Sequence, residues 1–135
     1  MQYRRPTKRS KYYLPPQIYD NVVTFCRCYP VWVKELQTLP DSSKAITYDK
    51  DKVQTSGCYD STAELALRRV ELEHKIDLIR TTAMITNPQM WEWILKYVTS
   101  KHVTIDDLIA QGMPCHRNTF SAMKAYFYYL ISKRI

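Results

Sequence analysis

The sequence predicts an all-α protein with an N-terminal helical hairpin, a long central helix and a C-terminal helix-turn-helix. Apolar residues recur at helical spacing in successive segments, and no segment shows the sustained alternation that is typical of strands. Prolines and the rare glycines stand where helices are expected to begin or end. A chain of 135 residues fits one domain of this kind.

The composition excludes several classes of protein. Hydrophobic residues make up 45% and charged residues 24%, as in an ordinary soluble domain. Only 2 glycines are present, so the glycine-rich phosphate loops of nucleotide-binding proteins are absent. No stretch approaches the roughly 18 apolar residues of a transmembrane helix. The basic N-terminus lacks the apolar run of a secretory signal, and we therefore expect a cytoplasmic location.

The net charge of +7 is concentrated at the two ends of the chain. Residues 108–135 contain four basic residues and no acidic one, whereas residues 20–107 are slightly acidic overall. Residues 1–19 contain no acid and five basic residues: Arg4, Arg5, Lys8, Arg9 and Lys11. Cationic ends favour a polyanionic partner such as double-stranded DNA, although basic ends also simply aid solubility. Membrane binding is disfavoured because these residues lack an amphipathic helix.

The first 60 residues divide into three segments. Residues 1–13 are basic and poor in aliphatic residues, which predicts a mobile arm. Residues 14–40 form a predicted helical pair that Pro15 and Pro16 open and Pro30 interrupts, because proline suits a first turn and breaks a helix interior. Residues 41–60 are polar and predict a long loop.

Residues 61–135 are predicted to form the main helical domain. Ser61 and Glu64 match a capping box at the start of a long helix that ends near Ile85. The apolar stripe of this helix comprises Leu65, Leu72, Ile76, Ile79 and Ala83. Asn87 and Pro88 then predict the start of another helix, which runs to about residue 100.

Residues 104–131 carry the pattern of a helix-turn-helix. Thr104 is placed to cap a short helix over 105–111, and Gly112 stands where a C-terminal glycine belongs. A final helix runs from about His116 to Ser132, with Phe120 among the residues of its apolar stripe. This order of short helix, tight turn and second helix is the one that places a helix in the major groove.

The other face of the final helix is expected to read DNA. It carries Arg117, Asn118, Ser121, Lys124 and Tyr128, with no acidic residue. Arginine suits guanine and asparagine suits adenine through paired hydrogen bonds, and base contacts concentrate in the first turn. A plain helical hairpin with a basic surface is the alternative.

Metal binding and catalysis find little support in the sequence. Cys26 and Cys28 are one residue apart, which is too close for the usual zinc-ligand pairs. Asp106 and Asp107 form the only adjacent carboxylate pair, and no nucleophile motif is present. We therefore expect no enzyme activity, no metal and no cofactor.

The overall pattern resembles the phage and prophage late-gene transcriptional regulators of the RinA/ArpU type. The matching features are Tyr29-Pro30 within an N-terminal helical pair, the polar loop, the helix over 61–85 and the one over 88–100. Two short stretches also match: residues 116–120 (HRNTF), at the start of the last helix, and residues 11–15 (KYYLP), near the N-terminus. The resemblance implies a phage or bacterial origin and DNA binding through a sigma-like C-terminal helix-turn-helix.

Two hypotheses of function follow. The first is a sequence-specific DNA-binding regulator, with RNA polymerase as a second candidate partner. The second is a helical structural or packaging protein, similar to a small terminase subunit, that forms a homo-oligomer and holds DNA without reading its sequence. Steep salt dependence without sequence preference would favour the second hypothesis.

Overall fold

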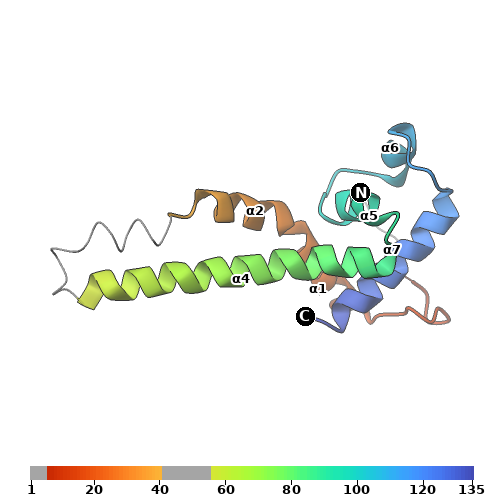
Figure 1. Cartoon of the computed structure of the whole chain (residues 1–135). Helices are drawn as coiled ribbons and strands as arrows, with labels where there is room; N and C mark the ends of the chain where they lie inside the picture. Colours follow the sequence, from red (N-terminus) through yellow and green to blue (C-terminus); the bar gives the residue numbers. More distant parts are fainter. Residues whose placement is uncertain (1–5, 41–55) are drawn as a thin grey trace. The chain divides into compact units, whose positions relative to one another are not determined.

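The computed structural model describes residues 6–40 and 56–135, and the side chains of residues 56–61 are left out of the description. The described residues are helical and contain no strand, so the predicted all-α class is confirmed. The helices are α1 (Pro16–Arg27), α2 (Tyr29–Thr38), α4 (Ser56–Thr86), α5 (Trp91–Val98), α6 (Ile105–Ala110) and α7 (Arg117–Ser132) (Figure 1).

The helices belong to two compact units. The first unit contains α1, the part of α4 from Asp77 onward, α5, α6 and α7. The second unit contains α2 from Val31 and α4 up to Ile76. Both boundaries between the units fall inside a helix, in α2 between Pro30 and Val31 and in α4 between Ile76 and Asp77.

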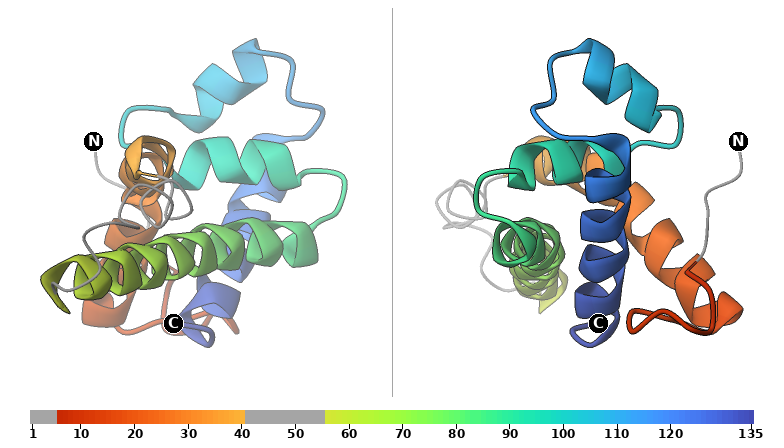
Figure 2. Two further views of the ribbon diagram at one scale, coloured as in Figure 1. Left: turned by 60° about the vertical axis from the view of Figure 1, so that its left-hand side comes forward. Right: turned by 90° about the vertical axis from the view of Figure 1, so that its right-hand side faces the viewer.

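The first unit has a closed hydrophobic core. In it α1, α5 and α6 pack against α7 (Figure 2), because each of these helices presents one apolar stripe. The fully buried side chains include Tyr19, Val22 and Cys26 of α1, Ile79 of α4, Ile94 of α5, Leu108 of α6, and Phe120, Phe127 and Ile131 of α7. This core fixes the position of α7, which carries the predicted reading face.

The second unit is held together by charge as well as apolar contact. No side chain of α2 is fully buried. Arg68 of α4 donates to both carboxylate oxygens of Glu35, with Nε–Oε2 at 2.6 Å and Nη2–Oε1 at 3.0 Å. This paired hydrogen bond lowers the pKa of Glu35. The ammonium of Lys75 lies 5.1 Å from the centre of the Trp32 ring, a cation–π contact.

Proline sets the boundary between α1 and α2, as the sequence predicts. Pro16 occupies the first turn of α1. The helix ends at Arg27, and the N–H of Cys28 donates to the carbonyls of Thr24 and Phe25. The next helix places Pro30 in its own first turn, where no backbone donor is needed.

The long helix α4 begins earlier than the sequence predicts. It starts at Ser56, so Ser61 lies inside the helix and is not its N-cap. Of the predicted loop over 41–60, residues 41–55 lie outside the described part, and residues 56–60 are helical. No proline stands between Ser56 and Ser61 to break the helix, and the capping-box pattern at Ser61 is a chance match. The other end, at Thr86, agrees with the prediction.

Asn87 is not the N-cap that the sequence predicts, because α5 has Met90 as its N-cap and Asn87 caps the turn before it. Its Oδ1 accepts hydrogen bonds from the N–H groups of Gln89 (2.9 Å) and Met90 (3.2 Å). These bonds close a turn that leads into α5, so the helix itself begins at Trp91 rather than at Pro88.

The N-terminal segment lies against α7 from Pro6 onward. The ring of Tyr12 lies 5.0 Å from that of Tyr126 and 5.6 Å from that of Tyr129, and Leu14 is buried. The predicted mobile arm covers residues 1–13, of which 1–5 are outside the described residues. In residues 6–13 the aromatic ring of Tyr12 supplies apolar contact with α7 that the charge pattern does not show, and the mobility of the arm stays a prediction.

Candidate nucleic-acid interface

Helix α6 begins at a complete capping box. The Asp107 N–H donates to Oγ1 of Thr104 at 3.1 Å, and the Thr104 N–H donates to Oδ2 of Asp107 at 3.0 Å. The predicted N-cap at Thr104 is therefore confirmed. The role of Asp107 as its reciprocal partner was missed, although an acid three residues after a threonine is the usual signal.

The turn between α6 and α7 depends on Gly112. Its φ of 101° lies in the left-handed region that other residues rarely adopt. The N–H of Gly112 donates to the carbonyl oxygen of Ile109, and the N–H of Met113 donates to that of Leu108. These two hydrogen bonds close the C-terminal end of α6. Met113 is 5% exposed and anchors the turn in the core.

We expect Gly112→Ala to destabilise the protein by about 1–2 kcal/mol, the cost of a left-handed backbone for an L-residue. A Cβ at this position would meet no atom within 4 Å, so the cost comes from the backbone alone. The measurement is the free energy of unfolding in urea. Gln111→Ala, at an exposed position with right-handed backbone, is the control and should change it by less than about 0.5 kcal/mol. Equal stability of Gly112→Ala and the wild type would contradict this account.

Helix α7 begins as predicted, with His116 as its N-cap. The Nδ1 atom of His116 accepts a hydrogen bond from the N–H of Asn118 at 3.2 Å. Arg117 lies at the first helical position, and its Nη1 is 2.9 Å from Oδ1 of Asp106 on α6. Because both side chains are more than half exposed, this ion pair contributes little to stability. Arg117 can therefore exchange Asp106 for another acceptor at small cost.

The exposed face of α7 is short and lies near its N-terminus. Arg117, Asn118, Thr119 and Ala122 are exposed, and Ser121 is half-buried. Thr119 and Ala122 were not among the predicted contact residues. Their short side chains allow another molecule to approach the helix closely, which a groove-binding helix requires.

Two of the predicted reading residues are not on this face. Lys124 is 6% exposed and Tyr128 is 3% exposed. The ammonium of Lys124 lies 5.4 Å from the centre of the Tyr97 ring, and the Tyr128 ring lies 5.3 Å from that of Tyr19. The prediction that both belong to an exposed reading face is wrong, because α1 and α5 pack against this side of α7. Burial also raises the pKa of Tyr128.

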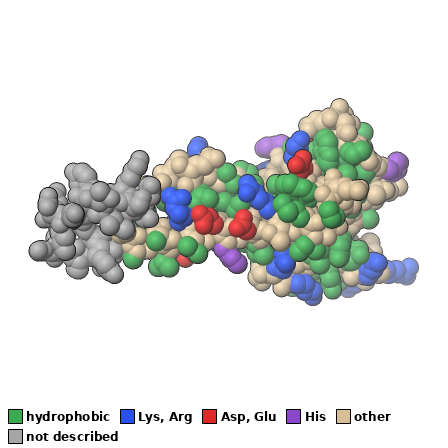
Figure 3. All heavy atoms as spheres, viewed as in Figure 1, with side chains coloured by type: hydrophobic (Ala, Val, Ile, Leu, Met, Phe, Trp, Pro, Cys, Tyr) green, Lys and Arg blue, Asp and Glu red, His purple; other side chains and the backbone are tan. Residues whose placement is uncertain are grey.

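The two basic ends of the chain meet on one surface. We call Lys8, Arg9, Lys11, Lys133 and Arg134 the basic patch, and all five are exposed. Two cation–π contacts join it to the stacked tyrosines: Lys11 lies 5.1 Å from the Tyr12 ring and Lys133 lies 5.0 Å from the Tyr129 ring. In Figure 3, Lys and Arg side chains gather at the lower right, over the segment that precedes α1. The predicted contacts Arg4 and Arg5 lie outside the described residues.

The described residues offer few other features that point to metal binding, thiol chemistry or a membrane. Cys26 is buried in the core, and burial raises the pKa of its thiol. Among residues 6–40 and 62–135, no three His, Cys, Asp or Glu side chains are grouped so that they could hold a metal ion. Within the same described part, none of the helices combines the length and apolar character needed to cross a membrane.

Comparison with known proteins returns no match: no protein-family model, no curated protein and no solved structure is similar to this chain.

Proposed function

We propose that the protein binds double-stranded DNA and reads it with α7 of the helix-turn-helix formed by α6 and α7. The observation that carries this proposal is the acid-free helix α7, whose first turn exposes Arg117 and Asn118 directly after the glycine turn. The capping box fixes the start of α6, and the buried Met113 anchors the turn that leads to α7. This arrangement supports insertion of the N-terminal end of α7 into the major groove.

The basic patch supports the same function through a different contact. Lysine and arginine side chains bind backbone phosphates and carry no sequence information, whereas the first turn of α7 offers groups that distinguish bases. The patch includes Lys133 and Arg134, which directly follow α7, and the first turn contains Arg117. One helix therefore connects a phosphate-binding surface with a base-reading one.

The proposed biological role is that of a phage or prophage transcriptional regulator in the bacterial cytoplasm. This part of the proposal is supported by the resemblance to the RinA/ArpU type. RNA polymerase is then a second partner, and no enzyme activity is proposed.

The packaging alternative has specific observations in its favour. With Lys124 and Tyr128 buried, the reading face retains three of its five expected side chains. In the second unit, α4 exposes the apolar side chains of Leu67 (64%) and Val70 (62%), which a homo-oligomer would cover. A small terminase-like oligomer that holds DNA without reading it would use these features.

Substitutions in the first turn of α7 distinguish the two functions. We expect Asn118→Ala and Arg117→Ala each to weaken binding to a selected DNA site by about 1–3 kcal/mol and to relax preference at one base pair. Binding to random DNA should change much less. The measurement is fluorescence anisotropy with duplexes selected from genomic fragments, and Lys101→Ala, at an exposed position outside the helix-turn-helix, is the control. Equal losses on selected and random DNA would favour the packaging function.

A further inference from the structure

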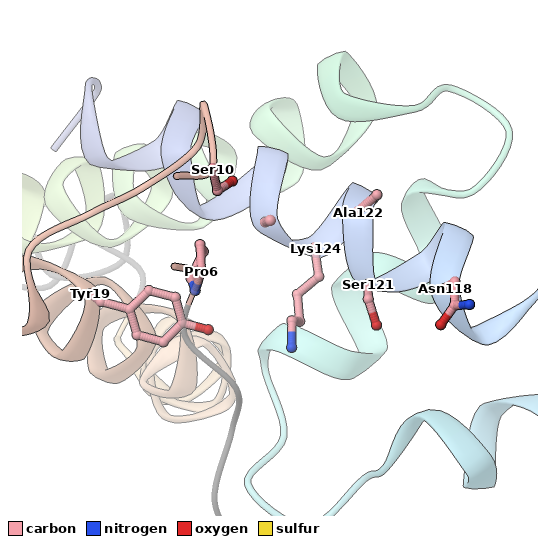
Figure 4. Close-up of a pocket in the computed structure, with 8 residues that line it drawn as sticks. Pro6, Ser10, Tyr19, Asn118, Ser121, Ala122 and Lys124 are labelled. Atoms are coloured by element: carbon pink, nitrogen blue, oxygen red, sulfur yellow. The ribbon is translucent and has the colours of Figure 1, made fainter. Parts of the chain in front are cut away.

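A cavity lies beside the reading face of α7, between this helix, the start of α1 and the N-terminal segment. Its volume is about 300 Å³. The polar side chains that line it are Lys124, Ser121 and Asn118 of α7, Tyr19 of α1 and Ser10 of the N-terminal segment. In the view of Figure 4, the ammonium of Lys124 lies between the hydroxyl groups of Tyr19 and Ser121, with the Asn118 amide one turn further along the helix.

The lining has the composition of an anion site. It combines one cation with three hydroxyl groups and one amide, and none of the described lining residues is acidic. Lys124 is more than nine-tenths buried, and its ammonium lies over the Tyr97 ring, 5.4 Å from the ring centre. A charge in such a place interacts strongly with an opposite charge that enters the same space. Hydroxyl and amide N–H groups add donors to anionic oxygens.

We propose that this cavity binds a phosphate group. A phosphate presents several acceptor oxygens, which match the ammonium of Lys124 and the hydroxyl groups of Ser121 and Tyr19. The small side chains of Ala122 and Ala125, which complete the α7 side of the cavity, leave room for the groups that carry the phosphate. Lys124 then contributes a phosphate contact from a buried position, in place of the base contact predicted from the sequence.

Two sources of the phosphate share this chemistry. The first is a backbone phosphate of DNA, since the cavity adjoins Asn118 and Ser121 of the proposed reading face; this source depends on the proposed function. The second is a free phosphate or a small phosphate ester, which binds regardless of DNA.

The direct test is titration of the isotopically labelled full chain with inorganic phosphate, against sodium chloride at equal ionic strength, followed by NMR. We expect saturable shifts of the backbone amides of residues 118–125. Lys124→Met should weaken this binding at least tenfold, whereas the control Lys96→Met, at an exposed lysine of α5, should change it less than twofold. The absence of saturable shifts in the wild type, or equal affinity in Lys124→Met, would overturn the proposal.

A second variant protects the test against misfolding. Ser121→Ala removes one hydroxyl from the cavity and leaves the charge of Lys124 in place. We expect it to weaken phosphate binding two- to fivefold without changing the thermal midpoint. If Lys124→Met does not fold, unchanged phosphate affinity in Ser121→Ala would overturn the site as described.

DNA binding then identifies the source. If the phosphate belongs to DNA, Lys124→Met should weaken binding equally on selected and random duplexes and lower the log–log salt slope by about one unit. If phosphate occupies the cavity but Lys124→Met leaves DNA binding unchanged, the ligand is a free phosphate or phosphate ester. Phosphate binding in a protein that binds no DNA would refute the proposed function and leave this site standing.

Discussion

Phe120→Ala is expected to destabilise the protein by about 3–5 kcal/mol, which is the range for removing a buried aromatic ring. Phe120 is completely buried in the first turns of α7, and its ring meets that of Tyr97 edge to face at 5.6 Å. Removing the ring leaves a cavity between α5 and α7, and the surrounding side chains can fill it only in part. The measurement is urea unfolding, followed by circular dichroism and by the fluorescence of Trp91 and Trp93 on α5.

The neighbouring residue provides a matched control for this prediction. Thr119→Ala changes an exposed position one residue away and should alter the free energy of unfolding by less than about 0.5 kcal/mol. An unchanged unfolding midpoint in Phe120→Ala would mean that α7 does not pack against α5 as described. The reading face would then lose the support that fixes its direction.

Much of the local structure could be predicted because the signals are local. Pro16 and Pro30 act through the geometry of their own rings, Thr104 through a bond three residues away, and Gly112 through its own φ. None of these signals requires knowledge of the tertiary fold. The buried stripe of α7, which contains Phe120, was also predicted, since helical spacing alone defines one face of a helix.

The side of α7 that α1 covers could not be predicted in this way. Lys124 and Tyr128 are polar, and the absence of acids around them resembles a DNA-reading face. The structure instead packs them beside α1, where the long stem of Lys124 and the ring of Tyr128 are apolar enough to be buried. A single-helix pattern contains no information about a second partner. The tyrosines of α1 and α7 were the available signal, because the rings of Tyr19 and Tyr128 meet edge to face.

The contact between the two basic ends of the chain could not be predicted from local sequence patterns either. The sequence shows two basic ends separated by about a hundred residues, and each can be interpreted alone as a solubilising tail. The contact between Tyr12 and Tyr129 brings Lys11 and Lys133 to one surface. Because the combined charge of that surface exceeds that of either end, its effect on DNA binding should be measurable in isolation.

The combined substitution of Lys8, Arg9 and Lys11 by glutamine should flatten the salt dependence of DNA binding. Each phosphate that a lysine or arginine neutralises contributes about 0.9 to the slope of log affinity against log salt, so we expect a decrease of roughly 2–3 units. All three side chains are exposed, and glutamine preserves the chain around Tyr12 and Leu14. The measurement is a salt titration on one duplex, and preference among DNA sequences should change little.

A control variant that loses the same number of charges elsewhere distinguishes a local effect of the patch from an effect of the net charge. Lys34, Lys96 and Lys101 are also exposed and lie outside the basic patch, so their combined replacement by glutamine lowers the charge equally. This variant should change the slope by less than about 0.5 units if affinity depends on counterions released at the patch itself. Equal slopes in the two triple variants would show that the patch does not touch DNA. Its five cations would then have to serve another acidic partner, and the first turn of α7 would be left as the whole DNA-binding surface.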